Sequence, residues 1–285
     1  MDEAVSLREF LMSRRAALDP RQVGLTGSSL PRRKPGLRRE EVAVLAGVSV
    51  DYYARLEQGR VGNVSEQVIT AIADALQLDQ LERAHLRTLI APTPWTPARR
   101  RETPRRARPA LRRLLDAMDP VPAMLQGPRL EVLATNRALR ALITDFDAMA
   151  PGLRNVARWL FLDPAARTVY PQWDQVAPPV AATLRANMNP HAPDDELDRL
   201  VAELTAESPD FARFWADYRL YEQRHGRKQF FHEAVGMMTL NYETLTVPGD
   251  EGWFISTYTA DLGSPSEEKL QLLLSWSAES AELRE

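Results

Sequence analysis

The sequence predicts a multidomain protein of the α and α+β classes, with an N-terminal bundle of five helices and a second domain in which an antiparallel sheet encloses a helical insertion. Three observations support this prediction. The length of 285 residues suits about two domains. Residues 91–109 hold five prolines with arginines between them, a composition typical of an extended linker, so the domains are expected at 1–90 and 110–285. Apolar residues follow a helical period before the linker and both helical and strand periods after it.

Capping signals mark the ends of the N-terminal helices. Ser6 and Glu9 form a capping-box signature, so the first helix is expected to begin at Ser6. Ser65 caps a fourth helix, and Asp79 with Glu82 caps a fifth. The predicted apolar stripe of the first helix consists of Leu7, Phe10, Leu11, Ala17 and Leu18.

The second and third helices are predicted on either side of a tight turn within residues 37–60. Gly47 can take the positive φ that a sharp turn needs, and the Ser49 hydroxyl can accept from a backbone N–H in the first turn of the next helix. The apolar surfaces that face each other are expected to come from Val42, Ala43, Leu45, Val48, Tyr53 and Leu56. The residues expected to point outward are Val50, Asp51, Ala54, Arg55 and Gln58.

Mixed chemistry on the outward face of the second helix is what reading the DNA major groove requires, although an ordinary helical hairpin has the same pattern. A basic segment leading into the pair favours DNA; it contains Arg32, Arg33, Lys34, Arg38 and Arg39.

The stretch from Leu37 to Arg60 closely resembles the helix-turn-helix of the XRE family of bacterial and phage repressors, over roughly residues 6–90. The resemblance implies a lambda-repressor-like bundle and a double-stranded DNA operator as partner. It places Val50, Asp51 and Arg55 toward base edges, and Arg39, Tyr52 and Arg60 near phosphates. Asp51 would be tolerated there only if it accepts from a cytosine amino group or holds Arg55. The expected DNA-binding residues are Arg32, Arg33, Arg38, Arg39, Ser49, Val50, Asp51, Tyr52, Arg55, Gln58 and Arg60.

Charge is distributed unevenly along the chain. Residues 1–110 hold 19 Lys and Arg against 13 Asp and Glu, whereas the remainder holds 17 against 26. Only the first part is therefore expected to lie on nucleic acid. Much of the basic excess falls between Arg99 and Arg108, where the arginines would either contact DNA phosphates or form a solvated spacer.

The second domain is predicted to open with a helix from Ala110 and to contain two strands, then helices, then three strands. Asn136 caps a helix that follows the first two strands, and residues 155–221 are helical by period. The predicted strands are Val121–Leu125, Leu130–Ala134, Gln229–Phe231, Gly236–Val247 and Trp253–Tyr258.

This order resembles a PAS-like sensor fold. The runs Arg129–Asn136, Ser208–Trp215 and Ala234–Leu240 resemble the ligand-binding domain of MmyB-like transcription regulators. The resemblance covers nearly all of 110–262 and implies a small apolar ligand, such as a fatty acid. Large aromatic side chains also serve as plain core, which is the alternative for the tryptophans and phenylalanines here. The expected ligand pocket consists of Leu133, Trp159, Phe161, Phe211, Trp215, Met238, Leu240 and Tyr258.

Other classes of function lack a sequence signal. The chain has no cysteine, so disulfides and thiolate metal sites are excluded, and without a signal sequence or a membrane-spanning apolar run it is expected in the cytoplasm, away from membranes. His232-Glu233 begins like a zinc-protease motif, but Gly236 stands where the second histidine would be. No catalytic residue, metal or cofactor is therefore expected. An enzyme is the third interpretation, after the two that follow.

Together these patterns predict a sequence-specific DNA-binding transcription regulator that acts as a homodimer and senses an apolar small molecule. The alternative is a second domain without ligand, which only pairs subunits or contacts RNA polymerase.

Overall fold

A computed structural model describes residues 3–21, 23, 36–62, 64–90, 106–188, 194–217, 225–250 and 252–282. The chain divides into two compact units. The first consists of Met1–Pro97 with two short later stretches, Met188–Asp195 and Phe214–Leu220; the second contains the remainder.

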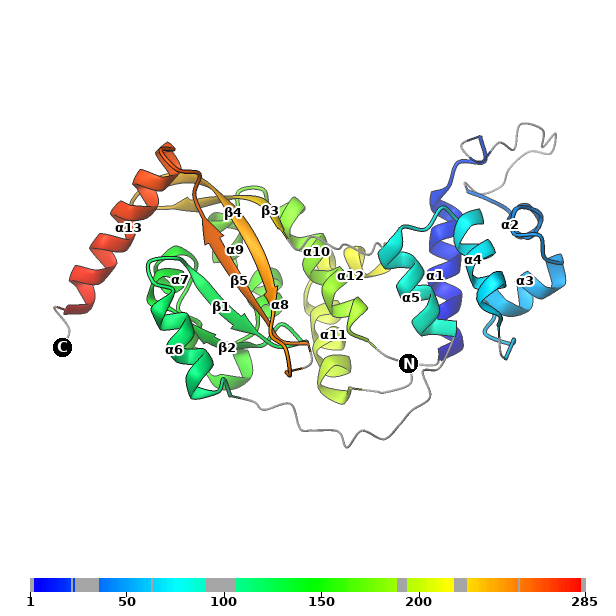
Figure 1. Ribbon diagram of the computed structural model, residues 1–285, viewed down its shortest axis with the longest axis horizontal. Coiled ribbons are helices and arrows are strands. Elements are labelled where there is room, and N and C mark those ends of the chain that lie inside the picture. Colours follow the sequence, from blue (N-terminus) through cyan, green and yellow to red (C-terminus); the bar gives the residue numbers. More distant parts are fainter. Residues whose placement is uncertain are drawn as a thin grey trace. The chain divides into compact units, whose positions relative to one another are not determined.

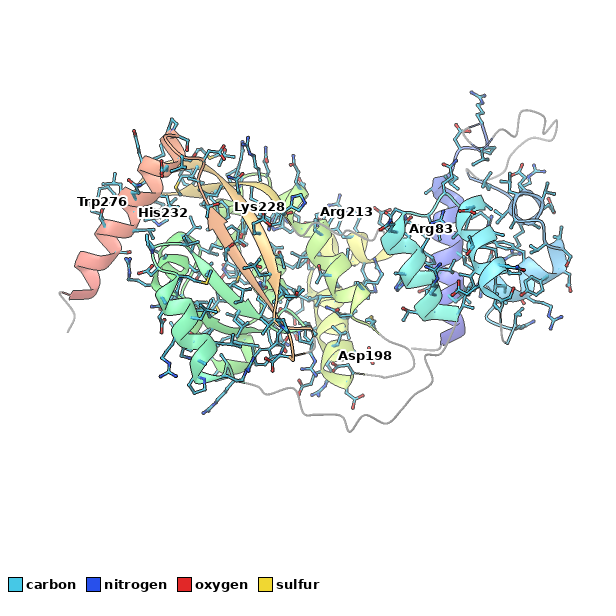
Figure 2. The ribbon with its side chains drawn as sticks, viewed as in Figure 1. Arg83, Asp198, Arg213, Lys228, His232 and Trp276 are labelled. Carbon is cyan, nitrogen blue, oxygen red and sulfur yellow. The ribbon has the colours of Figure 1, made fainter. Side chains whose placement is uncertain are left out.

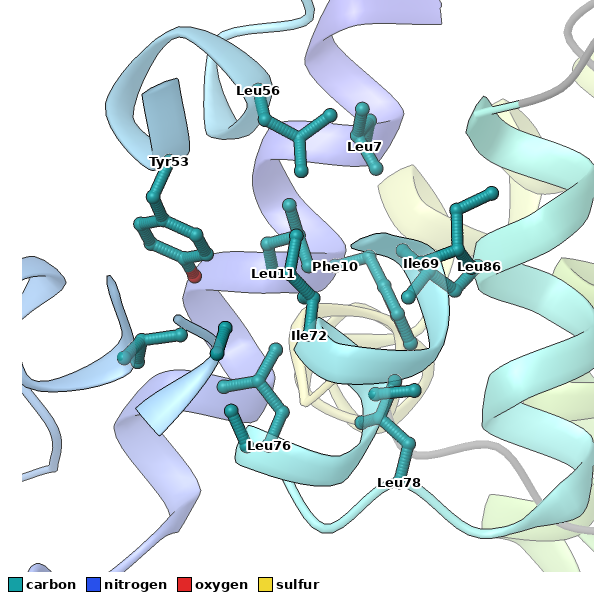
Figure 3. Packing of buried hydrophobic residues seen from close by; sticks show 14 of the residues in the cluster. Leu7, Phe10, Leu11, Tyr53, Leu56, Ile69, Ile72, Leu76, Leu78 and Leu86 are labelled. Atoms are coloured by element: carbon teal, nitrogen blue, oxygen red, sulfur yellow. The ribbon is translucent and has the colours of Figure 1, made fainter. Parts of the chain in front are cut away.

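The first unit contains the five helices that the sequence predicts, which confirms the bundle. They are α1 Glu3–Ala17, α2 Arg39–Leu45, α3 Val50–Glu57, α4 Glu66–Ala75 and α5 Gln80–Ile90. Side chains from all five helices meet in a single core. Figure 3 shows part of this core and labels Leu7, Phe10, Leu11, Tyr53, Leu56, Ile69, Ile72, Leu76, Leu78 and Leu86. Burying this many apolar side chains from several helices stabilises the bundle without any cross-link.

The predicted caps of α4 and α5 are confirmed. The Ser65 hydroxyl accepts from the Val68 N–H at 3.4 Å. Asp79 and Glu82 bond reciprocally, because Asp79 accepts from the Glu82 N–H at 2.8 Å and Glu82 accepts from the Asp79 N–H at 3.0 Å. Each bond satisfies an N–H that a helix terminus would leave without a partner.

Three expectations about this unit are wrong, one about the start of a helix and two about packing. α1 begins at Glu3, so Ser6 lies inside the helix and does not start it; each residue added to an existing helix gains a hydrogen bond, so a capping signature does not by itself stop extension. Ala17 is exposed at the end of α1, and Leu45 is 36% exposed at the end of α2. A terminal residue has fewer neighbours than its place in the period suggests.

The second unit contains α6 Pro109–Ala117, strands β1 Ala123–Gln126 and β2 Val132–Thr135, and then α7 Arg137–Leu142. Next come the helices α8 Val156–Leu162, α9 Ala165–Val169, α10 Trp173–Ala186, α11 Asp195–Glu207 and α12 Pro209–Ala216. Two short 3-10 turns, Phe146–Ala148 and Pro151–Leu153, precede them. The first residue of α11 and the last three residues of α12 are assigned to the first unit. The chain then forms β3 His225–His232, β4 Gly236–Thr246, β5 Phe254–Thr259 and α13 Pro265–Glu282.

The five strands form one antiparallel sheet of order β2-β1-β5-β4-β3 (Figure 1). The helical insertion lies between β2 and β3 in the sequence. This arrangement confirms the predicted PAS-like α+β domain. The helix α13 was not predicted, although Leu270, Leu273 and Leu274 recur with helical spacing and are buried.

The two faces of the sheet carry different side chains because neighbours along a strand point to opposite sides. One face packs on α6 through Leu115, Ala123, Leu125, Ala134, Trp253 and Ile255. We call the other the inner face; its buried hydrophobic residues on β3, β4 and β5 are Phe230, Met238, Leu240, Tyr242 and Tyr258. The register pairs Phe230 with Met238 and Tyr242 with Tyr258, so these side chains lie side by side.

Candidate DNA-binding surface and ligand-binding face

The turn between α2 and α3 has the geometry that the sequence predicts. Gly47 has φ +64°, and no atom would obstruct a side chain at this position, so backbone conformation alone is the reason for glycine. The Val48 N–H donates to the Ala43 carbonyl at 3.0 Å and closes the turn. The Ser49 hydroxyl accepts from the Tyr52 N–H at 3.1 Å, which confirms the predicted cap of α3.

The helix α3 has a buried face and an exposed face. Tyr53 and Leu56 are buried in the bundle core, whereas Val50, Asp51 and Arg55 are exposed. Neither Asp51 nor Arg55 forms a side-chain hydrogen bond or ion pair within the described residues, so Asp51 does not hold Arg55 in place here. The exposed face of α3 thus presents one carboxylate, one guanidinium and an apolar side chain at its start.

A buried carboxylate ties α3 to the two helices beside it. The Glu57 side chain is fully buried, and its Oε1 accepts from Arg39 Nε at 3.0 Å and Nη2 at 2.7 Å. Its Oε2 accepts from Arg15 Nε at 3.3 Å, while Arg15 also donates to the Leu37 carbonyl at 2.7 Å. The hydrogen bonds that Arg39 donates to Glu57 raise the pKa of Arg39 above its usual value. The carboxylate therefore fixes α3 against α1 and α2.

Glu57 is not among the residues predicted from the sequence to matter for DNA binding. The available signal was its position: it follows Tyr53 by four residues and Leu56 by one, so it falls on the buried face of α3. A buried acid needs a cation, and two arginines lie on the preceding helices. Arg39 was expected near a phosphate; its guanidinium is bound to Glu57, and a phosphate contact by Arg39 stays a prediction.

The other residues expected to bind DNA are distributed around the helix-turn-helix. Arg38 precedes α2 and is partly buried. Tyr52 on α3 and Gln58, which follows the end of α3, are partly exposed, and Ser49 and Arg60 are exposed. Arg32 and Arg33 lie outside the described residues.

A row of aromatic rings leads from the helices of the second unit to the inner face of the sheet. Trp159 of α8 contacts Tyr170 with ring centroids 5.9 Å apart, Tyr170 contacts Phe230 at 5.1 Å, and Phe230 contacts Tyr258 at 5.2 Å. Of the predicted pocket residues, Trp159, Met238, Leu240 and Tyr258 belong to this row or to the strands beside it.

The remaining predicted pocket residues lie elsewhere. Phe161 packs on Phe211, with ring centroids 5.0 Å apart. Leu133 packs in the cluster beneath α6, next to Ala134 and Leu125. Trp215 falls in the first compact unit. The structure thus does not gather all eight residues in one place, because register and helix direction, rather than residue type, decide which side chains share a face.

Polar groups accompany the aromatic row. Tyr170 and Tyr258 are hydrogen-bonded to each other, and burial raises the pKa of both hydroxyls. Trp159 Nε1 is buried and has no hydrogen-bond partner among the described residues. Lys228 of β3 places Nζ 4.2 Å from the centroid of the Tyr242 ring and 5.9 Å from that of Tyr258. Burial lowers the pKa of Lys228 to about 8.

Two structural features of other functions were not found in the described part of the chain. No group of three or more His, Asp or Glu side chains in these segments could hold a metal ion. None of the helices there combines the length and the apolar character that crossing a membrane requires.

A helix-turn-helix bundle joined to a PAS-like α+β domain defines a DNA-binding protein with a second, ligand-binding domain. Residues 8–86 match the helix-turn-helix domain family, which is the region of the bundle. Residues 107–273, more than half of the chain, match the MmyB-like transcription regulator ligand binding domain. The chain belongs to this family of transcription regulators. No curated protein matches the chain.

Proposed function

We propose that this MmyB-like regulator reads its operator through the exposed face of α3 and responds to a small, largely apolar ligand on the inner face of its sheet. The observation that carries the ligand half is Trp159 Nε1, a buried donor with no hydrogen-bond partner among the described residues, placed beside apolar side chains. Buried donors are nearly always satisfied, so this one is suited to bond a ligand. A few polar groups on a mostly apolar surface are typical of small-molecule sites.

A fatty acid fits this chemistry, since its chain would contact rings and aliphatic side chains and its headgroup would meet donors. Extraction of the purified full-length protein followed by mass spectrometry tests for a bound lipid. A thermal-shift series of fatty acids of increasing chain length tests for added ones. Trp159→Phe keeps an aromatic ring but removes the indole N–H donor, so it should reduce the thermal shift that fatty acids cause. Trp276→Phe, at an exposed tryptophan of α13, is the matched control. No bound lipid and no shift at any chain length would refute the proposed ligand.

The DNA half of the proposal requires two subunits. One recognition helix reads only a few base pairs, so a homodimer on two half-sites about one helical turn apart supplies the specificity. Domain limits of 1–90, 91–109 and 110–285 and a cytoplasmic location belong to the same proposal. Sedimentation at micromolar concentration tests the dimer, and a monomer both with and without operator DNA would contradict it.

A second candidate is a domain that pairs subunits or contacts RNA polymerase and binds no ligand. The observation in its favour is an apolar pair on α13, Leu272 and Trp276, which are 44% and 43% exposed and lie one helical turn apart. Changing both to glutamate should abolish pairing if this candidate is right. Retention of the dimer together with a fatty-acid shift would exclude it.

A further inference from the structure

Lys228 stands out among the basic residues of the second unit. The sequence holds 36 lysines and arginines, of which only Lys34, Lys228 and Lys269 are lysines. Lys228 lies opposite Leu240 in the β3–β4 register, and two residues before Phe230, which places it on the inner face. Figure 2 labels it on the strands of this unit.

The ammonium group of Lys228 has no acidic partner in the described part of the chain. Burial is the one cause that shifts its pKa, to about 8, whereas a nearby carboxylate would raise it. The neighbouring Arg227 pairs with Asp261 at 2.7 Å, and Glu243 points to the opposite face because it follows Tyr242. Lys228 is half-buried. Even partial removal of a cation from water without an anion is costly, and the Tyr242 ring compensates only part of that cost.

The backbone on β3 is adapted to hold this ring. Gly226 lies opposite Tyr242, and a Cβ at Gly226 would approach the Tyr242 ring to 3.1 Å. Glycine therefore leaves the space that the Tyr242 ring occupies beside β3, next to the ammonium group of Lys228. The hydroxyls of Tyr242 and Tyr258 are neutral, since burial raises the pKa of both.

A cation, neutral hydroxyls and an indole N–H, beside Phe230, Met238 and Leu240, are complementary to an amphiphile with an acidic head. We propose that Lys228 is the anion-binding residue of the ligand site, and that the ligand is a chain-bearing acid whose carboxylate or phosphate lies against the ammonium group above Tyr242 and Tyr258. This inference rests on the proposed function, because it needs a ligand on the inner face.

The test compares three probes of equal chain length: dodecanoate, dodecyl phosphate and the uncharged dodecanol. Each is titrated calorimetrically into the full chain. The wild type should bind the acids about 10- to 100-fold more tightly than the alcohol, the range expected for a hydrogen bond to a charged group. Lys228→Met should lose this preference and keep its affinity for dodecanol. Lys269→Met, which removes a lysine that donates to the Met237 carbonyl, should behave as the wild type.

The outcomes separate the two proposals. The role of Lys228 is overturned if the wild type binds acid and alcohol equally, or if Lys228→Met still prefers the acid. Either result leaves the proposal of an apolar ligand intact. Failure of every probe to bind the wild type overturns the ligand itself, and the role of Lys228 with it. A phosphate affinity more than tenfold above that of dodecanoate identifies the headgroup as a phosphate; the reverse identifies a carboxylate.

A spectroscopic readout excludes a merely structural effect of the substitution. Reductive ¹³C-methylation labels lysine side chains, and the sequence gives only three such signals besides the N-terminus. The Lys228 signal should titrate near pH 8 without ligand and at a higher pH with dodecanoate, while the Lys269 signal stays constant. A Lys228 signal that titrates at the same pH with and without dodecanoate would overturn the inference.

Discussion

Replacing Glu57 by glutamine should loosen the recognition helix more than any exposed ion-pair change in the bundle. The substitution keeps the shape and removes the charge that holds Arg15 and Arg39. Breaking a fully buried pair costs about 3 to 5 kcal/mol. Here Arg39 is 41% exposed and Arg15 19% exposed, so both can regain water, and solvent screening reduces the expected cost to about 2 kcal/mol.

Hydrogen exchange with mass spectrometry on the full chain measures this cost locally. A loss of about 2 kcal/mol corresponds to a rise of about 30-fold in the opening constant of the protected amides in α3. The matched control is Glu66→Gln, whose partner Arg87 lies at 3.2 Å with both side chains largely exposed. That change should cost below about 0.5 kcal/mol. Equal effects of the two substitutions would refute the reasoning.

Three further predictions concern the two halves of the molecule. Arg55→Ala should lower the affinity for the operator by about 1 to 3 kcal/mol and leave the affinity for scrambled DNA unchanged, whereas Arg60→Ala should weaken binding to both DNAs and reduce the salt slope by about one unit. Binding titrations across a salt series distinguish these two effects. Equal losses of affinity for operator and scrambled DNA in Arg55→Ala would show that Arg55 contacts a phosphate. Gly47→Ala should destabilise the bundle by about 1 to 2 kcal/mol through the left-handed conformation alone, and an unchanged thermal midpoint would contradict this. The pKa of Lys228 is lower in the folded than in the unfolded chain, so the unfolded chain binds more protons between about pH 8 and pH 10 and the wild type should become more stable as the pH rises through this range. In urea unfolding, Lys228→Met should therefore be more stable than the wild type near pH 7 and should lose that advantage by pH 10. A stability difference that does not change with pH would count against this prediction.

The helix-turn-helix could be predicted in detail because its signals are local. Gly47, Ser49 and Ser65 act within three or four residues of themselves, and the structure confirms the turn and both caps. Glu57 was missed because its partners are 18 and 42 residues away in the sequence, and an exposed and a buried acid look alike in a helical pattern.

The ligand-binding face was only partly predictable. The strand period located Met238, Leu240 and Tyr258, because alternation assigns faces within a strand. It could not tell which side of the sheet Leu133 would join, nor that Trp215 would fall in the other compact unit. Lys228 was overlooked for a different reason: a search for apolar residues passes over a cation that shares their face.

Asn136 places a constraint on how a signal can leave the ligand-binding domain. Its side chain accepts from the Ala123 and Leu139 N–H groups, each at 3.0 Å, and donates to the Val121 carbonyl at 2.7 Å and the Leu115 carbonyl at 3.3 Å. All four hydrogen-bonding positions of the amide are thus used, and no other side chain offers two donors and two acceptors of this size. The first strand and the helices α6 and α7 are joined at one buried point, so they are expected to shift as a unit. Any displacement of β1 by a ligand would therefore be transmitted to α6, the helix through which the chain enters the domain.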